Sequence, residues 1–407
     1  MLYQLENTIQ KYAWGSASLM PDFLGRENPE KEPWAELWMG AHPKAPSLAR
    51  PASSRGKAAP LDELIAAGPA AFLGGKNLNA FGAQLPFLFK LLAAASPLSI
   101  QCHPSLNQAR AGFERENRAG LAADSPERNY RDANHKPEII LAVTPFSALR
   151  GLRPVQEIAH FFSGFPVPEL RELARGLTRA DAGENIKTFL RYLLSAPARS
   201  AKSWIASLKA QSGSCAAGEN LPEYRAFVRL SDFYPEDAGC LAPFYLNLVQ
   251  LAPGEALFLG PGELHAYLEG LGVELMANSD NVLRAGLTPK HIDVQELLAV
   301  VSCAAAKAEI LRPAGTVRGG FVEEEYPRRA EEFTLSVLRP KAGDSNAQAV
   351  IETGGPEILF CGGGGARLTS GSAACRLAKG ESVFVPASEK NYTLSGRCLV
   401  YRARVPS

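Results

Sequence analysis

The sequence predicts a mainly β protein with an α-helical insert and a β-barrel unit that occurs twice. Three observations predict this fold: short apolar runs bounded by Gly and Pro, a central block with helical periodicity, and a pattern that recurs near the C-terminus. The chain of 407 residues is long enough for two or three packed units. We therefore expect the chain to divide into domains where these patterns change.

The β-rich character is clearest in the middle of the chain. The runs Phe244–Gln250, Ala256–Leu259 and Leu264–Leu268 are separated by Pro253-Gly254 and by Gly260-Pro261-Gly262. Gly and Pro at these places indicate turns between short strands. Even spacing of such strands is typical of a barrel or a sandwich.

A helical pattern interrupts the strands. Ile186, Phe189, Leu190 and Leu193 follow the i, i+3, i+4, i+7 spacing of one helix face. The predicted domains are a catalytic unit of residues 1–150 and 241–310, a helical insert of residues 151–240 and a C-terminal unit of residues 311–407.

A repeated pattern links the catalytic unit to the C-terminal unit. Residues 251–258 resemble residues 377–384, and a proline and then a tyrosine follow in each copy. The position of His265 in the first copy falls on Lys390 or Asn391 in the second. We therefore expect the C-terminal unit to be structural and free of metal.

Local signals predict two smaller features. Asp293 is a suitable N-cap for a short helix over Val294–Val301. The four glycines of Gly362–Gly365 are not followed by GK[ST], so they predict a tight hairpin rather than a phosphate-binding loop.

The charge balance excludes some classes of partner. With 43 basic and 42 acidic side chains the net charge is +1, so we expect neither a nucleic-acid nor a membrane partner. The first ten residues lack the apolar core of a signal peptide, and the seven cysteines form no CxxC pair. These features predict a protein of the reducing cytoplasm.

The segment Leu98–His103 alternates apolar and polar residues. A strand here would place Ser99, Gln101 and His103 on one face. The interior of a barrel is the natural place for such a polar face.

Two further strands supply carboxylate and imidazole groups. Glu138 begins the run Glu138–Val143, with Lys136 on its side of the sheet and His135 directed elsewhere, and His265 shares a face with Tyr267. Two imidazoles, one carboxylate and one amide oxygen suit zinc or another divalent ion. A lone histidine on a strand is more often structural, so spacing alone leaves that alternative open.

Four cationic residues lie near these groups in the sequence: Lys90, Lys136, Arg284 and Lys290. Arginine and lysine suit the phosphate of a sugar phosphate or the charge of an enediolate-like transition state. Any one of them taken singly is more often a solvated surface charge.

Six segments taken together resemble type I phosphomannose isomerases, and they occur in order over about the first three hundred residues. They are Tyr12–Ser16, Pro33–His42, Gln101–Pro104, Asn129–Glu138, His265–Leu268 and Asn278–Lys290. The turn Gly260–His265 departs from the asparagine-containing version found in many members, and the last eighty or so residues carry no matching motif.

The resemblance implies a cupin-type (jelly-roll) fold with a second, metal-free cupin unit. It also implies interconversion of mannose 6-phosphate and fructose 6-phosphate with one zinc ion per chain. The zinc ligands carried over from the family are Gln101, His103, Glu138 and His265.

The resemblance further assigns a catalytic role to Arg284 and substrate-pocket positions to Lys90, Ser99, Lys136, Glu274 and Lys290. The reaction would pass through a cis-enediol, with Glu274 or Lys136 as the acid/base group. The sequence leaves that choice open.

Two alternative functions are a cupin dioxygenase with non-haem iron and a sugar-binding cupin without catalysis. Gln101 and the cationic residues favour the isomerase. We expect a small sugar phosphate substrate and a monomeric enzyme.

Overall fold

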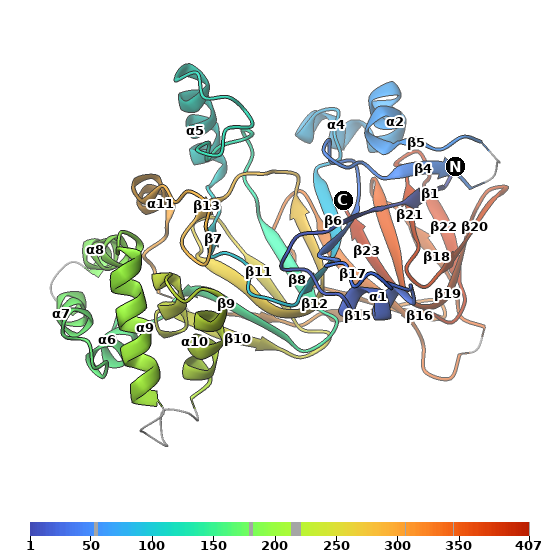
Figure 1. Ribbon diagram of the computed structural model, residues 1–407. Coiled ribbons are helices and arrows are strands. Elements are labelled where there is room, and N and C mark those ends of the chain that lie inside the picture. The colour runs from blue at the N-terminus through green and yellow to red at the C-terminus, as the bar shows by residue number, and fades with distance from the viewer. Residues whose placement is uncertain (53–55, 179–181, 213–220, 306, 345, 407) are drawn as a thin grey trace.

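The computed structural model describes residues 1–52, 56–178, 182–212, 221–305, 307–344 and 346–406. Two large antiparallel sheets lie side by side, and a group of helices packs at the end of the first sheet that is far from the second (Figure 1). The prediction of a mainly β fold with a helical insert is confirmed.

The first sheet carries most of the predicted functional residues. Its strands among the described residues are β2 (Thr8–Gln10), β3 (Glu36–Met39), β6 (Phe87–Ala94), β7 (Gln101–Cys102), β8 (Glu138–Ala142), β9 (Phe146–Leu152), β10 (Leu246–Leu251), β11 (Ala256–Leu259), β12 (His265–Ala277), β13 (Leu283–Arg284) and β14 (Ile310–Leu311). The main path runs β14-β11-β8-β12-β6-β3-β2, and β7, β9, β10 and β13 pair beside it.

Strand β12 organises this sheet. Its C-terminal part pairs with β6 and β8, and its N-terminal part pairs with β7 and β9. Gly270 lies where the pairing changes, with φ of 123°, and a Cβ there would lie 2.7 Å from the backbone oxygen of Pro145. Glycine is therefore required at this bend. The same strand carries His265 and Glu274.

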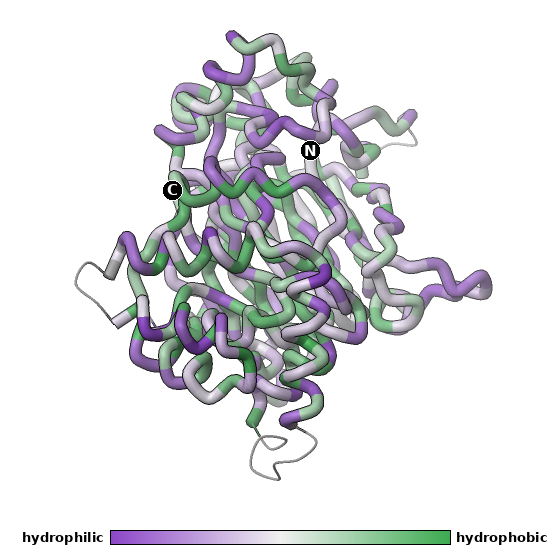
Figure 2. The backbone as a smooth tube through the Cα atoms, turned by 60° about the vertical axis from the view of Figure 1, so that its left-hand side comes forward, coloured by the Kyte–Doolittle hydropathy of each residue, from purple (hydrophilic) through white to green (hydrophobic). Residues whose placement is uncertain are grey.

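Apolar side chains fill the space around this sheet. Leu92, Ile140, Phe146, Leu257 and Tyr267 come from five different strands and belong to one buried cluster. Figure 2 shows hydrophobic stretches running through the body of the protein, while the hydrophilic stretches gather on the outer loops. Polar groups that point into such an interior must find partners there.

The helical insert consists of α6 (Val155–Ser163), α7 (Pro168–Leu177), α8 (Ala182–Leu194), α9 (Ala198–Ser212), α10 (Pro222–Phe233) and the 3-10 helix η1 (Ala238–Phe244). The periodic residues Ile186, Phe189, Leu190 and Leu193 lie on α8 and are buried. The predicted face of that helix is confirmed.

The remaining helices are α1 (Leu19–Leu24), α2 (Leu61–Ala67), α3 (Pro69–Leu73), α4 (Gly75–Phe81), α5 (Leu106–Arg118) and α11 (Val294–Val300). The predicted N-cap of α11 is confirmed, since the Asp293 side chain accepts a hydrogen bond from the backbone N–H of Glu296. Among the described residues, no helix combines the length and the apolar character needed to cross a membrane.

The second sheet is built mainly from the C-terminal part of the chain. Its strands are β1 (Tyr3–Glu6), β4 (Leu48–Pro51), β5 (Ala59–Pro60), β15 (Ala314–Arg318), β16 (Phe321–Glu325), β17 (Thr334–Pro340), β18 (Gln348–Glu352), β19 (Glu357–Ser370), β20 (Ala373–Ala378), β21 (Ser382–Val385), β22 (Asn391–Ser395) and β23 (Cys398–Arg404). The first strand of the chain, β1, lies between β21 and β4.

The predicted repeat is confirmed at its turns. The Glu255 carboxylate accepts from the backbone N–H of Ala252, and the Glu381 carboxylate accepts from the backbone N–H of Ala378. The preceding glycines have φ of 90° and 86°. Each turn leads into a corresponding strand, β11 or β21, so both copies fold in the same way locally.

The hairpin predicted for Gly362–Gly365 is wrong. These glycines lie inside the long strand β19, beside an irregularity in its pairing with β23 between Cys361 and Gly363. At Gly364, with φ of 67°, a Cβ would lie 1.8 Å from the backbone oxygen of Arg397. The glycines therefore allow a close approach of two strands and do not form a turn.

Candidate metal centre

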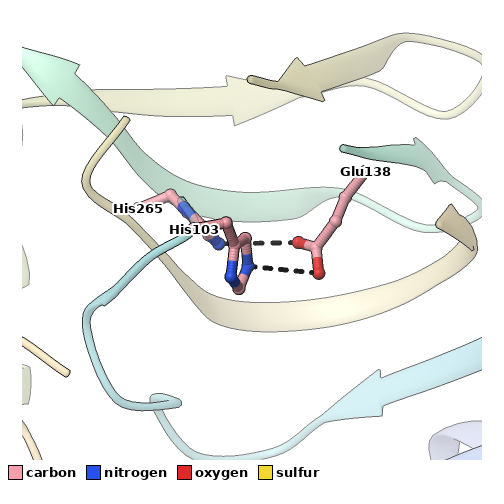
Figure 3. Close-up of side chains that lie close together, drawn as sticks. All are labelled: His103, Glu138 and His265. Carbon is pink, nitrogen blue, oxygen red and sulfur yellow. Dashed lines mark ion pairs between the residues drawn. The ribbon is translucent and has the colours of Figure 1, made fainter. Parts of the chain in front are cut away.

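Three buried side chains from separate segments converge on one point (Figure 3). His103 Nε2 lies 3.3 Å from Oε1 of Glu138, and His265 Nε2 lies 3.5 Å from its Oε2. Their relative exposures are 0% for His103 and 3% each for Glu138 and His265. One ligand atom from each residue lies within 4.8 Å of the others.

Backbone carbonyls fix the tautomers of the two imidazoles. Nδ1 of His103 lies 2.8 Å from the carbonyl oxygen of Asn281, and Nδ1 of His265 lies 2.9 Å from that of Glu263. A carbonyl only accepts, so each Nδ1 carries the proton and each Nε2 presents a lone pair.

A lone pair held in this way needs a partner. Among the described residues, the buried Nε2 of His103 has no hydrogen-bond partner. Histidine ligands typically donate their second N–H to a carbonyl while the other nitrogen binds the metal. The donor set therefore fits zinc or another divalent ion.

Gln101 lies on β7, between two strands that carry other predicted site residues. It pairs with His265 on β12 and with Arg284 on β13. Residues directly opposite each other on antiparallel strands project from the same face. The strand register therefore brings Gln101 to the same face as His265 and Arg284.

The strand predicted over Leu98–His103 is shorter than expected. Only Gln101–Cys102 is a strand, and His103 lies in the loop that follows. Pro104 has no N–H and ends the pairing. The half-buried Ser99 lies in the irregular segment before β7.

The charges around Glu138 favour its ionised form. The Lys136 ammonium lies 3.0 Å from Oε1 of Glu138. Burial alone would raise the pKa of Glu138, but Lys136 and His103 hold that pKa well below its usual range. Burial lowers the pKa of His103 to about 4, against the opposing charge of Glu138. Both groups are thus in the states that bind a metal cation.

A second buried charge group lies on the neighbouring strands. Lys90 and Glu274 face each other across β6 and β12, with 3.0 Å between Nζ and Oε2. The same ammonium lies 3.3 Å from Oε1 of Glu36. Burial opposes the charge of Lys90, but Glu274 and Glu36 raise its pKa. Burial raises the pKa of Glu274, against the attraction of Lys90.

Arg131, Arg284 and Lys290 form a group of three cations that influence one another's charge. Burial and the charge of Arg131 lower the pKa of Arg284, and burial, Arg284 and Arg131 lower the pKa of Lys290. The Arg131 guanidinium donates to the backbone oxygens of Ala123 and Ser125. Among the described residues, no carboxylate pairs with these three cations, so the site attracts an anion.

The structure brings His103, Glu138 and His265 together, with Lys136 against Glu138 and Lys90 against Glu274, and it adds two neighbours of these groups. Arg131 and Glu36 were not singled out from the sequence, although each lies inside a motif that carried the resemblance. Their roles depend on contacts with residues far along the chain, which spacing does not reveal.

The comparisons with known proteins agree along the whole chain. The family model "Phosphomannose isomerase type I, catalytic domain" matches residues 2–155, and "Mannose-6-phosphate isomerase, cupin domain" matches residues 324–405. The mannose-6-phosphate isomerase of Escherichia coli K12 is 41% identical over 396 residues, which cover 97% of each chain. The human enzyme is 38% identical over 323 residues, covering 74% of this chain and 73% of its own.

Solved structures give the same result. A structure titled as zinc-bound mannose 6-phosphate isomerase superposes with a TM-score of 0.89 at 36% identity and covers 100% of both chains. A variant of phosphomannose isomerase from Salmonella typhimurium gives the same TM-score, identity and coverage. The chain therefore belongs to the type I phosphomannose isomerase family.

Proposed function

We propose that this protein interconverts mannose 6-phosphate and fructose 6-phosphate. The observation that carries the proposal is the convergence of His103, Glu138 and His265 on a face that also carries Arg284, which with Arg131 and Lys290 has no acidic partner within the part of the chain that the structure describes. A metal centre next to an anion site suits a phosphorylated sugar. The family membership points to the same substrate class.

The phosphate is proposed to bind at Arg131, Arg284 and Lys290. Burial, and after it the repulsion among these cations, lowers the pKa values of Arg284 and Lys290. An anion bound between the cations would relieve that repulsion. Arginine offers a planar fork and lysine a compact charge for phosphate oxygens. Ser99 is proposed to complete the substrate pocket beside Gln101.

The proposed zinc ligands are Gln101, His103, Glu138 and His265. When bound, zinc would supply Lewis-acid polarisation of the substrate oxygens. The chain contributes a buried setting in which backbone carbonyls orient the two imidazoles beside one carboxylate. Lys136 holds the Glu138 carboxylate in place.

The isomerisation moves a proton from C2 of the open-chain aldose to C1 of the ketose through a cis-enediol. Glu274 is our preferred base, because burial raises its pKa towards neutrality and Lys90 fixes its carboxylate. Lys136 is the alternative, since it lies beside the metal ligand Glu138. Arg284 is proposed to stabilise the negative charge that develops on oxygen.

A coupled assay that follows fructose 6-phosphate from mannose 6-phosphate tests the proposal. Activity should disappear on chelation and return with zinc. Turnover that is insensitive to metal removal, or absent from the zinc-loaded protein, would reject it.

A cupin dioxygenase is the main alternative, because two histidines and one carboxylate also suit non-haem iron. The unpaired cations beside the ligands favour a phosphorylated substrate instead. Metal analysis together with oxygen consumption distinguishes the two functions.

We propose that residues 1–150 and 241–310 form the catalytic unit, 151–240 the insert and 311–407 a structural, metal-free unit. Lys390 and Asn391, at the place equivalent to His265, are exposed, which supports a metal-free C-terminal unit. We also propose that the protein is a monomer, which light scattering can check. The six described cysteines are free, which agrees with a cytoplasmic location.

A further inference from the structure

The side chain of Asn281 makes four hydrogen bonds to backbone atoms across two loops of the site, one before β8 and one before β13. Asn281 is 0% exposed. Its Oδ1 accepts from the backbone N–H of Arg131 (2.6 Å) and of Asp132 (3.2 Å). Its Nδ2 donates to the backbone oxygens of Asp132 and Asn134, both at 2.8 Å. Both lone pairs and both protons of the amide are thus used.

A carboxylate and a hydroxyl strengthen this connection. Ser279 Oγ donates to Oδ1 of Asp132 at 2.9 Å, and the backbone N–H of Asp280 donates to its Oδ2 at 2.8 Å. Ser279 is 2% exposed, so this contact is shielded from water. We call Ser279, Asn281 and Asp132 the loop clasp.

The loop clasp contacts both a proposed metal ligand and one of the cations. The backbone carbonyl of Asn281 accepts from Nδ1 of His103, and its side chain fixes the backbone of Arg131. Arg284 follows Asn281 by three residues along the same segment. A shift of Asn281 would therefore disturb an imidazole ligand and two cations together.

We propose that Asn281 is a positioning residue that couples the metal centre to the anion-binding cations. Its amide is fully engaged with the backbone of residues 131–134 and is not among the proposed zinc ligands. Asn281 acts through the orientation of His103 and the placement of Arg131. The inference rests on the proposed function, because the reaction requires both parts to hold one substrate.

The test is Asn281→Asp, which keeps the volume and replaces the donating NH₂ by an oxygen. That oxygen would face the backbone oxygens of Asp132 and Asn134 and would repel them. Zinc affinity should fall about 10- to 100-fold, as for other residues that orient a ligand. Binding of inorganic phosphate should weaken on the order of tenfold, the effect of losing about one charge-assisted hydrogen bond.

Neither measurement requires turnover. The zinc affinity is measured by competition with a chelator, and the phosphate affinity by titration calorimetry with inorganic phosphate. Ser279→Ala is a milder variant that should change both affinities in the same direction and still fold. Asn28→Asp is the matched control, since the Asn28 amide also bridges loop segments, through Ala17 and Glu32, but away from the site. It should leave both affinities unchanged.

The proposal is overturned if folded Asn281→Asp and Ser279→Ala proteins bind zinc and phosphate within twofold of wild type. A loss of zinc affinity with unchanged phosphate binding would overturn the coupling. A wild-type protein that binds both ligands and does not isomerise mannose 6-phosphate would refute the proposed function. The zinc and phosphate affinities of the variants could still be compared with those of wild type.

Discussion

Replacing Glu274 by Gln tests the choice of the base. The group of Lys90, Glu36 and Glu274 contains one cation and two carboxylates, so the variant removes an excess negative charge from a buried place. The amide of Gln can still accept from the Lys90 ammonium, so the fold should tolerate the change. Loss of a general base typically slows a reaction 10²- to 10⁴-fold, or about 3–5.5 kcal/mol in the barrier.

The expected result is a fall in kcat of that size, with nearly unchanged KM and zinc content. Exchange of the C2 proton with deuterated solvent should slow by the same factor. Glu36→Gln is the matched control, because it changes the charge beside Lys90 equally and leaves Glu274 in place. A kcat within tenfold of wild type for Glu274→Gln would refute the assignment and leave Lys136 as the candidate to test next.

Four other predictions concern the metal, the oxyanion, the second barrel and acid stability. His265→Ala should remove most of the bound zinc together with activity, and a fully loaded, active variant would exclude His265 as a ligand. Arg284→Ala should lower kcat about 10²- to 10³-fold and raise KM less, which steady-state kinetics would check; an unchanged kcat would remove its transition-state role. Arg402→Met should destabilise the second sheet by roughly 3–5 kcal/mol in urea unfolding, while zinc content stays the same. The variant leaves Glu357 buried without its cation and removes one of the two cations, Arg402 and Arg318, that pair with Glu323. Burial would raise the pKa of Asp280, but His42 and Lys44 lower it below its usual 3.8. The pairing therefore stabilises the fold above that pH, and the stabilisation is lost as the pH falls further. Lys44→Met should reduce this pH dependence by about 0.5 kcal/mol, and an unaltered acid unfolding profile would contradict the pairing.

Much of the fold could be predicted from local signals. The periodicity of α8, the cap of α11 and the repeated turns before β11 and β21 depend on neighbours in the sequence. The glycines at 362–365 misled the prediction, because their small size serves an approach between strands rather than a turn.

The candidate site was predicted only in part. Residue type and motif pointed to His103, Glu138 and His265, and these three side chains do converge. Arg131 and Asn281 act through contacts across about 150 positions, such as the one from the Arg131 backbone to the Asn281 side chain. No short-range pattern encodes such a pair.

The position of β1 within the second sheet has a consequence for biosynthesis. Tyr3 pairs with Pro51 on β4 and with Phe384 on β21, so one edge of β1 can pair early and the other only after about 380 further residues have been made. At about 5–20 residues per second, this delay lasts roughly 20–75 seconds. A nascent chain that stalls before β21 would present an unpaired edge at its N-terminus, where chaperones and proteases can engage it.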